Sequence, residues 1–232
     1  MDKRKKLIIG ASNANSLANE LLVHSVRIYK VLPYLITNFL ARREHILRGV
    51  EEIYIFPDCN SLYPTQKSFA DRSGRFHTHF SKHMKKPRSL TTYYSEYSHL
   101  LDHLPAHCSI TIMPVFLRNV FPSCNCESAV RFNTGRAVFL ARTVERGLFN
   151  LAASKGFAKI DLLEQSTLCR DILSSISGEE YLNTTSQIEK VYTFLLLGTD
   201  GIHFSNSARK VVIEWYKHYL NLNLLQNNPP GV

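Results

Sequence analysis

Four residues in three stretches have the types and spacing needed for acyl-transfer chemistry. Asp200 and His203 lie three residues apart around Gly201, so a tight turn would place the carboxylate against the imidazole. The carboxylate would then fix the ring tautomer, leaving the other ring nitrogen free to take a proton from a hydroxyl. Ser12 supplies such a hydroxyl, and Asn60 supplies an amide that can donate to a developing oxyanion.

Each of these residues also has a simpler structural interpretation. Ser12 begins the stretch SNAN, which is good helix-capping chemistry, and Asn60 follows Pro57 as a turn residue would. Asp200 and His203 alone would suit a capped turn before a helix. Taken singly, the structural interpretations are favoured, but the three stretches together are hard to produce by accident.

The surrounding pattern predicts strands and helices that alternate along one domain. Strands are expected at 6–10, 26–31, 53–56, 109–113 and 157–163, and helices at 14–24, 35–48, 89–104, 135–155 and 207–222. Residues 65–89 and 118–132 are expected to be irregular, and residues 170–198 give no clear pattern. Such alternation predicts a parallel sheet covered by helices on both faces, with sites at the carboxyl ends of the strands.

Three stretches of the chain resemble one known family. IIGASN, DCNSL and DGIHFSNSA occur in the order and spacing of the blocks of the SGNH hydrolases, also called GDSL-type esterases. The chain is also similar to the small esterase domains of animal retroelements, over about residues 7–220. The resemblance implies a flavodoxin-like three-layer α/β/α sandwich with a central, mainly parallel sheet.

The resemblance also implies a role for each residue. Ser12 would be the nucleophile, His203 the general base and Asp200 its orienting partner, while Asn60 and the Ser12 N–H would form the oxyanion hole. The implied activity is hydrolysis of small acyl esters through an acyl-enzyme, with no cofactor and no metal.

The chain departs from the family pattern at several positions. Ala11 stands where the family has Asp, the stretch 32–34 lacks the Gly of the second block, and Asp58 and Ala208 replace two further Gly residues. Losing one oxyanion donor typically costs about 10²–10³ in rate. These departures favour an alternative, a catalytically weak or inactive module of the same fold that binds RNA or another polyanion.

A basic segment at 67–89 is the second feature that favours this alternative. The 232-residue chain has a net charge of +9, and the segment alone contains seven Lys/Arg and one Asp. Phe69, Phe76 and Phe80 interleave with the charges, which suits nucleic-acid stacking or an anionic surface. Candidate contacts to an anion or substrate are Arg72, Arg75, Lys82, Lys85, Lys86 and Arg118. The simpler interpretation is a solvated loop.

Composition sets the remaining expectations. We expect a basic tail at 1–6, a single domain at 7–222 and a C-terminal tail at 223–232. No apolar run reaches the roughly 18 residues of a membrane span, and the apolar stretch after the basic start is too short for a signal peptide. We therefore expect an intracellular, cytoplasmic protein with five reduced cysteines. The sequence does not indicate an oligomeric state.

Overall fold

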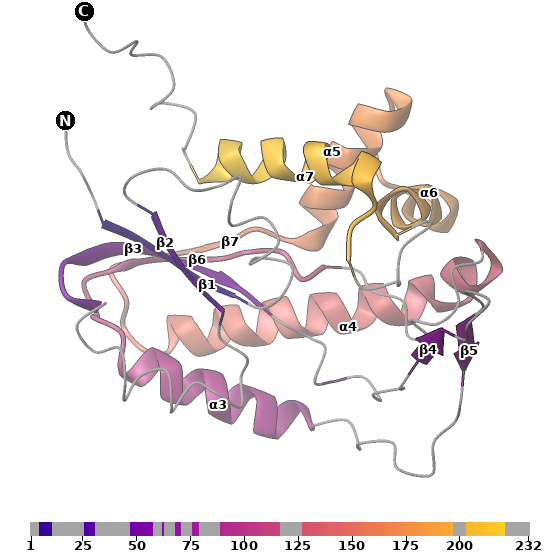
Figure 1. Ribbon diagram of the computed structural model, residues 1–232. Helices are drawn as coiled ribbons and strands as arrows, with labels where there is room; N and C mark the ends of the chain where they lie inside the picture. Colours follow the sequence, from indigo (N-terminus) through magenta and orange to yellow (C-terminus); the bar gives the residue numbers. More distant parts are fainter. Residues whose placement is uncertain are drawn as a thin grey trace, which may run out of the picture.

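A five-stranded parallel sheet forms the centre of the molecule (Figure 1). The computed structural model describes residues 5–10, 26–30, 47–57, 62, 68–70, 76–78, 89–116, 127–196 and 203–220. The sheet has the order β2-β1-β3-β6-β7 and consists of β1 (Lys5–Gly10), β2 (Val26–Lys30), β3 (Val50–Phe56), β6 (Ser109–Ile112) and β7 (Lys159–Leu162). The chain passes from β1 outward to β2 and returns to β3 on the other side of β1. The strand order therefore reverses between β1 and β3, as in doubly wound sheets.

The strands alternate their apolar side chains between two buried faces. Leu7 and Ile9 of β1 contribute to one core, and Ile8 between them contributes to the other. In β3, Ile53 likewise faces the first core and Tyr54 the second. Because successive residues of a strand point to opposite faces, a continuous apolar run produces a sheet that must be covered on both sides.

Helices provide that cover on both faces. The helices are α3 (Leu90–Asp102), α4 (Glu127–Ala153), α5 (Gln165–Ser177), α6 (Thr185–Leu196) and α7 (Asn206–Tyr219). α3 and most of the buried face of α4 pack on one core, while α5, α6 and α7 pack on the other. Figure 1 shows the resulting three layers, with α3 and α4 below the sheet and α5, α6 and α7 above it.

Most of the predicted elements are confirmed. All five strands occur within three residues of their expected bounds, and the helices expected at 89–104 and 207–222 are α3 and α7. In the helix expected at 207–222, helical spacing aligns Trp215 with Val211 and Tyr219 and predicts that it belongs to the core; it is 8% exposed, and its Nε1 donates to Asp171 Oδ2 at 2.8 Å. The helices expected at 14–24 and 35–48 lie outside the described residues except at Leu47 and Arg48.

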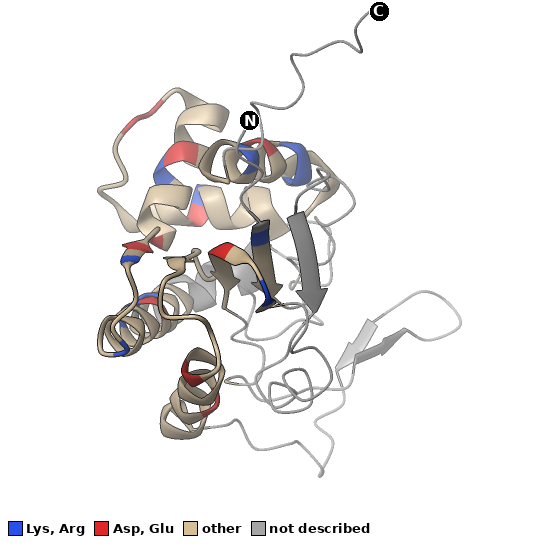
Figure 2. Cartoon of the chain, turned by 90° about the vertical axis from the view of Figure 1, so that its left-hand side faces the viewer, with Lys and Arg blue, Asp and Glu red and all other residues tan. Residues whose placement is uncertain are grey.

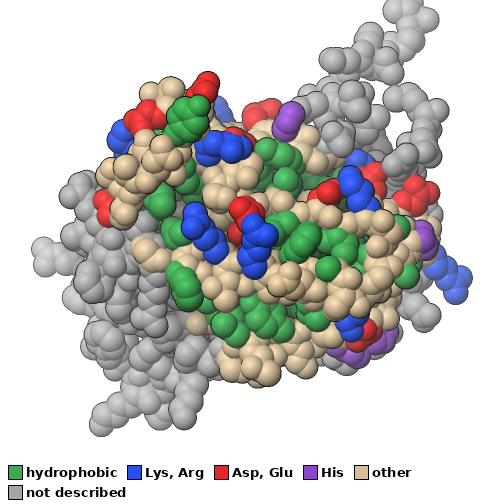
Figure 3. Space-filling view, turned by 180° about the vertical axis from the view of Figure 1, so that it is seen from behind, with side chains coloured by type: hydrophobic (Ala, Val, Ile, Leu, Met, Phe, Trp, Pro, Cys, Tyr) green, Lys and Arg blue, Asp and Glu red, His purple; other side chains and the backbone are tan. Residues whose placement is uncertain are grey.

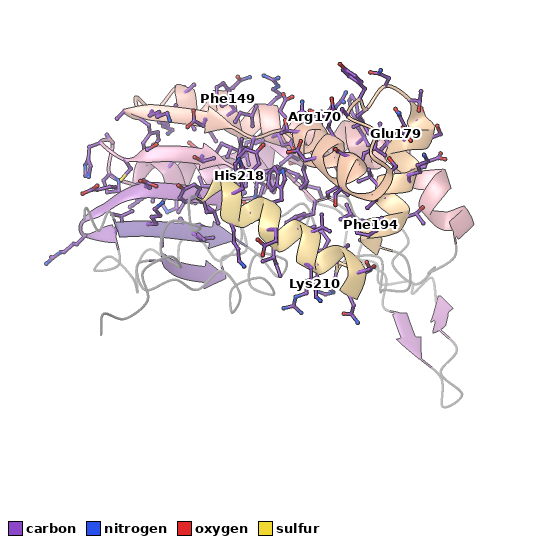
Figure 4. The ribbon with its side chains drawn as sticks, turned by 90° about the horizontal axis from the view of Figure 1, so that it is seen from above. Phe149, Arg170, Glu179, Phe194, Lys210 and His218 are labelled. Atoms are coloured by element: carbon purple, nitrogen blue, oxygen red, sulfur yellow. The ribbon has the colours of Figure 1, made fainter. Side chains whose placement is uncertain are left out.

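Two predictions of irregular structure are wrong in part. α4 begins at Glu127, so residues 127–132 are helical where a loop was expected. No Pro or Gly interrupts the chain between Pro122 and Gly135, and helix therefore extends back toward the proline. Within residues 65–89, β4 (Ser68–Ala70) and β5 (Phe76–Thr78) form an antiparallel pair. Figures 1 and 4 both show this pair on the side of the sheet where the parallel strands end.

Candidate active site

The carboxyl ends of four neighbouring strands form the edge where a site is expected. Gly10 at the end of β1 is the register partner of Phe56 at the end of β3, and Ile55 is the partner of Ile112 in β6. The hydrogen bonds continue just past the strands, since Met113 N donates to Ile55 O at 2.8 Å and Leu163 N donates to Ile112 O at 3.0 Å. The segments that leave these strands therefore start side by side.

His203 lies exposed just before α7, two residues ahead of its N-cap. Ser205 is the N-cap of α7, and its Oγ accepts from Ala208 N at 3.1 Å. The same hydroxyl donates to Phe194 O at 2.8 Å, and Ser205 N donates to Leu195 O at 2.6 Å. Figure 4 shows this end of α7, marked by Lys210, beside Phe194 of α6. Both bonds of Ser205 to α6 thus anchor the residues that follow His203.

A pair of aromatic rings connects His203 to the sheet. The ring of Phe204 meets the ring of Phe116 edge-on, with centroids 4.5 Å apart and an interplanar angle of 81°. Phe116 belongs to the segment that follows β6, and its ring also lies 5.7 Å from that of Tyr216. The residue directly after His203 therefore contacts the carboxyl end of the sheet.

Glu145 of α4 is a buried acid that sequence analysis missed. It is 1% exposed, and its Oε1 accepts hydrogen bonds from Val115 N and Gln165 N, both at 2.9 Å. Burial raises its pKa to about 8, and the charge of Glu164 adds to this effect against the two backbone hydrogen bonds and Arg142. Glu145 is therefore mostly protonated at neutral pH. Its position in the apolar stripe of the helix expected at 135–155, directly after Val144, was the signal for a buried carboxyl.

Further buried polar groups surround this carboxyl. Within the described part of the chain, Glu145 Oε2, Gln165 Nε2 and Tyr216 Oη are buried without a hydrogen-bond partner. Burial and the nearby Glu145 raise the pKa of the Tyr216 hydroxyl and bring that of the Cys169 thiol to about 12. Burial likewise raises the pKa of Cys108 to about 11. Because a thiolate is needed for attack, neither Cys169 nor Cys108 is a nucleophile at neutral pH.

Of the residues predicted for the site, the structure describes His203. The other predicted site residues lie outside the described part of the chain: Ser12, Asn60, Asp200, Arg72, Arg75, Lys82, Lys85, Lys86 and Arg118. Among the described residues, no cluster of three or more His, Cys, Asp or Glu side chains could hold a metal ion. No described helix has the length and apolar character needed to cross a membrane.

The fold defines an α/β protein with a doubly wound parallel sheet and helices on both faces. No protein-family model matches the chain, and no curated protein matches it.

Proposed function

We propose that this protein is a serine esterase of the SGNH hydrolase type that hydrolyses small acyl esters. The observation that carries the proposal is the contact of Phe204 with Phe116, which brings the main chain beside His203 to the carboxyl edge of the sheet. β1 and β3, the strands that precede Ser12 and Asn60 in the sequence, end at that same edge.

Chain length supports the convergence of these residues. Ser12 follows Gly10 by two residues, so their Cα atoms can be no more than about 7 Å apart. Asn60 follows Pro57 by three residues, so the Cα atoms of these two residues can be no more than about 11 Å apart. The strand order also reverses between β1 and β3, and ligand sites of doubly wound sheets lie at such a point.

The proposed reaction proceeds in two halves. Ser12 Oγ attacks the ester carbonyl carbon while His203 takes the hydroxyl proton, and Asp200 holds the imidazole in the required tautomer. The tetrahedral oxyanion accepts hydrogen bonds from the Ser12 N–H and the Asn60 side-chain amide. Its collapse expels the alcohol, which takes the proton from His203. Water, activated by the same imidazole, then releases the acid from Ser12.

An ester assay tests this proposal directly. We expect wild type to hydrolyse a short-chain nitrophenyl ester and to react with a fluorophosphonate probe. Ser12→Ala and His203→Ala should each lower kcat by at least about 10³-fold, since the members of such a triad act as a unit. His218→Ala is the matched control, because His218 is an exposed histidine near the opposite end of α7 (Figure 4). If wild type neither labels nor turns over faster than Ser12→Ala, the proposal is wrong.

The uneven charge distribution favours a second candidate function, polyanion binding. Residues 67–89 account for six of the nine net positive charges of the chain. The described elements instead present Lys/Arg and Asp/Glu side chains interspersed with one another (Figures 2 and 3). A cluster that includes Arg72, Arg75, Lys82, Lys85 and Lys86 would attract phosphates, whether or not the ester site is active.

A salt titration tests the second candidate. Binding to single-stranded RNA should weaken as salt rises, because each neutralised phosphate releases counterions. Binding that does not respond to salt would exclude phosphate contacts as its basis.

A further inference from the structure

Glu145 joins two segments that leave neighbouring strands at the carboxyl edge. Val115 follows β6, and Gln165 is the first residue of α5, which follows β7. Both backbone N–H groups donate to the single oxygen Oε1 at 2.9 Å. The N-cap of α5, Glu164, makes no side-chain capping bond of its own. Glu145 therefore satisfies one of the N–H groups that a helix start leaves unpaired.

A short series of contacts leads from this carboxyl to His203. Val115 is fully buried and is followed at once by Phe116, which is 8% exposed. The Phe116 ring packs edge-on against Phe204, the residue next to His203. Edge-on aromatic pairs attract each other beyond the effect of the area they bury, so this contact can bias the position of the segment.

We propose that Glu145 is a positioning residue: it fixes Val115 and Phe116 just past the end of β6, and thereby holds Phe204 and the neighbouring general base of the proposed reaction, His203, at the carboxyl edge of the sheet. This inference rests on the proposed esterase function. Glu145 does not touch the reacting atoms, and its influence passes through the Phe116–Phe204 pair.

The surroundings of Glu145 favour its neutral form. Burial and the charge of Glu164 raise the pKa of Glu145, and its two backbone hydrogen bonds and Arg142 offset this only in part. Cys169 of α5 also lies within the electrostatic reach of the carboxyl and is itself a neutral thiol. A neutral amide of the same shape can accept the same two N–H groups, so Glu145→Gln should keep the connection, whereas Glu145→Leu removes it.

The first test compares kcat and KM in these two variants, with active enzyme counted by fluorophosphonate titration. We expect Glu145→Gln to retain kcat within about threefold. Glu145→Leu should lower kcat by at least tenfold and leave KM within about twofold. Glu214→Gln, at an exposed acid of α7, is the control and should match wild type. The inference would be overturned if Glu145→Gln and Glu145→Leu lost equal amounts of kcat, or if Glu145→Leu lost none.

The second test measures amide hydrogen exchange and does not depend on esterase activity. Glu145→Leu should speed exchange at Val115, Gln165 and Ser205 by at least tenfold, while the amides of α3 are unchanged. If wild type has no esterase activity but exchange changes as expected, the proposed function fails and the connection stands. Unchanged exchange at Ser205 would overturn the connection itself.

A second variant covers the case in which Glu145→Leu does not fold. Phe116→Leu interrupts the same series of contacts and leaves Glu145 in place. We expect it to lower kcat and speed exchange at Ser205, while Val115 N stays protected by Glu145. If Phe116→Leu keeps the kcat of wild type and its exchange rate at Ser205, the Phe116–Phe204 pair does not have the proposed role.

Discussion

A buried carboxyl whose pKa is raised by folding makes the stability of the folded protein depend on pH. The pKa of Glu145 is raised by burial from 4.5 to about 8 in the folded protein. The folded state therefore binds this proton more tightly than the unfolded state does. The contribution of Glu145 to stability is fully present below pH 4.5 and is lost as pH rises toward 8.

Glu145→Gln should remove this pH dependence. Between pH 5 and pH 7.5 the free energy of unfolding of wild type should fall by about 3 kcal/mol relative to the variant, since each pKa unit is worth 1.36 kcal/mol. Urea unfolding at the two pH values measures the difference. Glu214→Gln, which changes an exposed acid, should follow wild type. Parallel pH dependence in wild type and Glu145→Gln would contradict the buried, neutral carboxyl.

Single residues differ in how far the sequence reveals their role. Trp215 was correctly assigned to the core, because helical spacing puts it among apolar neighbours. His203 was found through its spacing from Asp200 and Gly201. The position of Glu145 in an apolar stripe indicates a buried carboxyl, but its role could not be predicted, because its partners are backbone N–H groups of Val115 and Gln165, which leave no mark in a sequence.

At the scale of elements, the start of α7 depends on its N-cap. Ser205→Ala removes the bond to Ala208 N and leaves Phe194 O without this donor. We expect a loss of about 1–2 kcal/mol in unfolding free energy and a several-fold lower kcat, because His203 lies two residues before the cap. Chemical denaturation and the ester assay measure the two effects.

Ser89→Ala is the matched control for the cap of α7. Ser89 caps α3 through Thr92 N at 3.1 Å, and α3 covers the other face of the sheet. Losing this cap should lower the free energy of unfolding by about 1 kcal/mol and leave kcat unchanged. Equal effects of both substitutions on kcat would contradict a specific role for Ser205 in holding His203.

The contact between α3 and α4 depends on a glycine. A Cβ at Gly147 would overlap the hydroxyl of Tyr94, which donates to Thr143 O at 2.8 Å. Gly147→Ala should therefore destabilise the protein by about 1–3 kcal/mol, despite the better helix propensity of Ala. Gly135→Ala in the same helix meets no atom within 4 Å and should stabilise by about 0.5–1 kcal/mol. Thermal unfolding of both variants measures this contrast, and a stabilised Gly147→Ala would contradict the packing.

Elements with a strong apolar period were predicted well, and short or polar ones were not. β1 and β3 contain the apolar runs Leu7–Ile9 and Ile53–Phe56, and β6 alternates buried Ile residues with small polar ones, patterns that indicate a strand. β4 and β5 are three residues each and lie in a basic segment, so they are too short to show the alternation that predicts a strand. α5 and α6 each bury an apolar stripe in the core under α7, but the mostly polar stretch 177–187 between them hides the helical period of the segment.

At the scale of the whole molecule, strand order turns distant sequence positions into neighbours. β1 and β3 are about 45 residues apart along the chain, yet Gly10 and Phe56 are register partners. β6 lies on the far side of β3, and Phe116, in the segment that follows β6, meets Phe204. The alternation of strands and helices predicted the parallel sheet. The reversal point that brings these ends together is a property of the topology, which sequence periodicity does not determine.

The charge of the whole molecule leads to a final prediction about polyanions. If the 67–89 segment binds RNA, replacing Lys82, Lys85 and Lys86 together by Gln should flatten the slope of log K against log salt by about 2, at roughly 0.7 per phosphate contact. The lysines of the matched control, Lys159 and Lys190, already pair with Asp161 and Glu179 in the fold. Replacing these two by Gln should leave the slope unchanged, because their charge is already balanced locally. Binding measured by fluorescence anisotropy over a salt series gives both slopes. Equal flattening in the two variants would mean that net charge alone attracts the RNA, without a defined site in the segment.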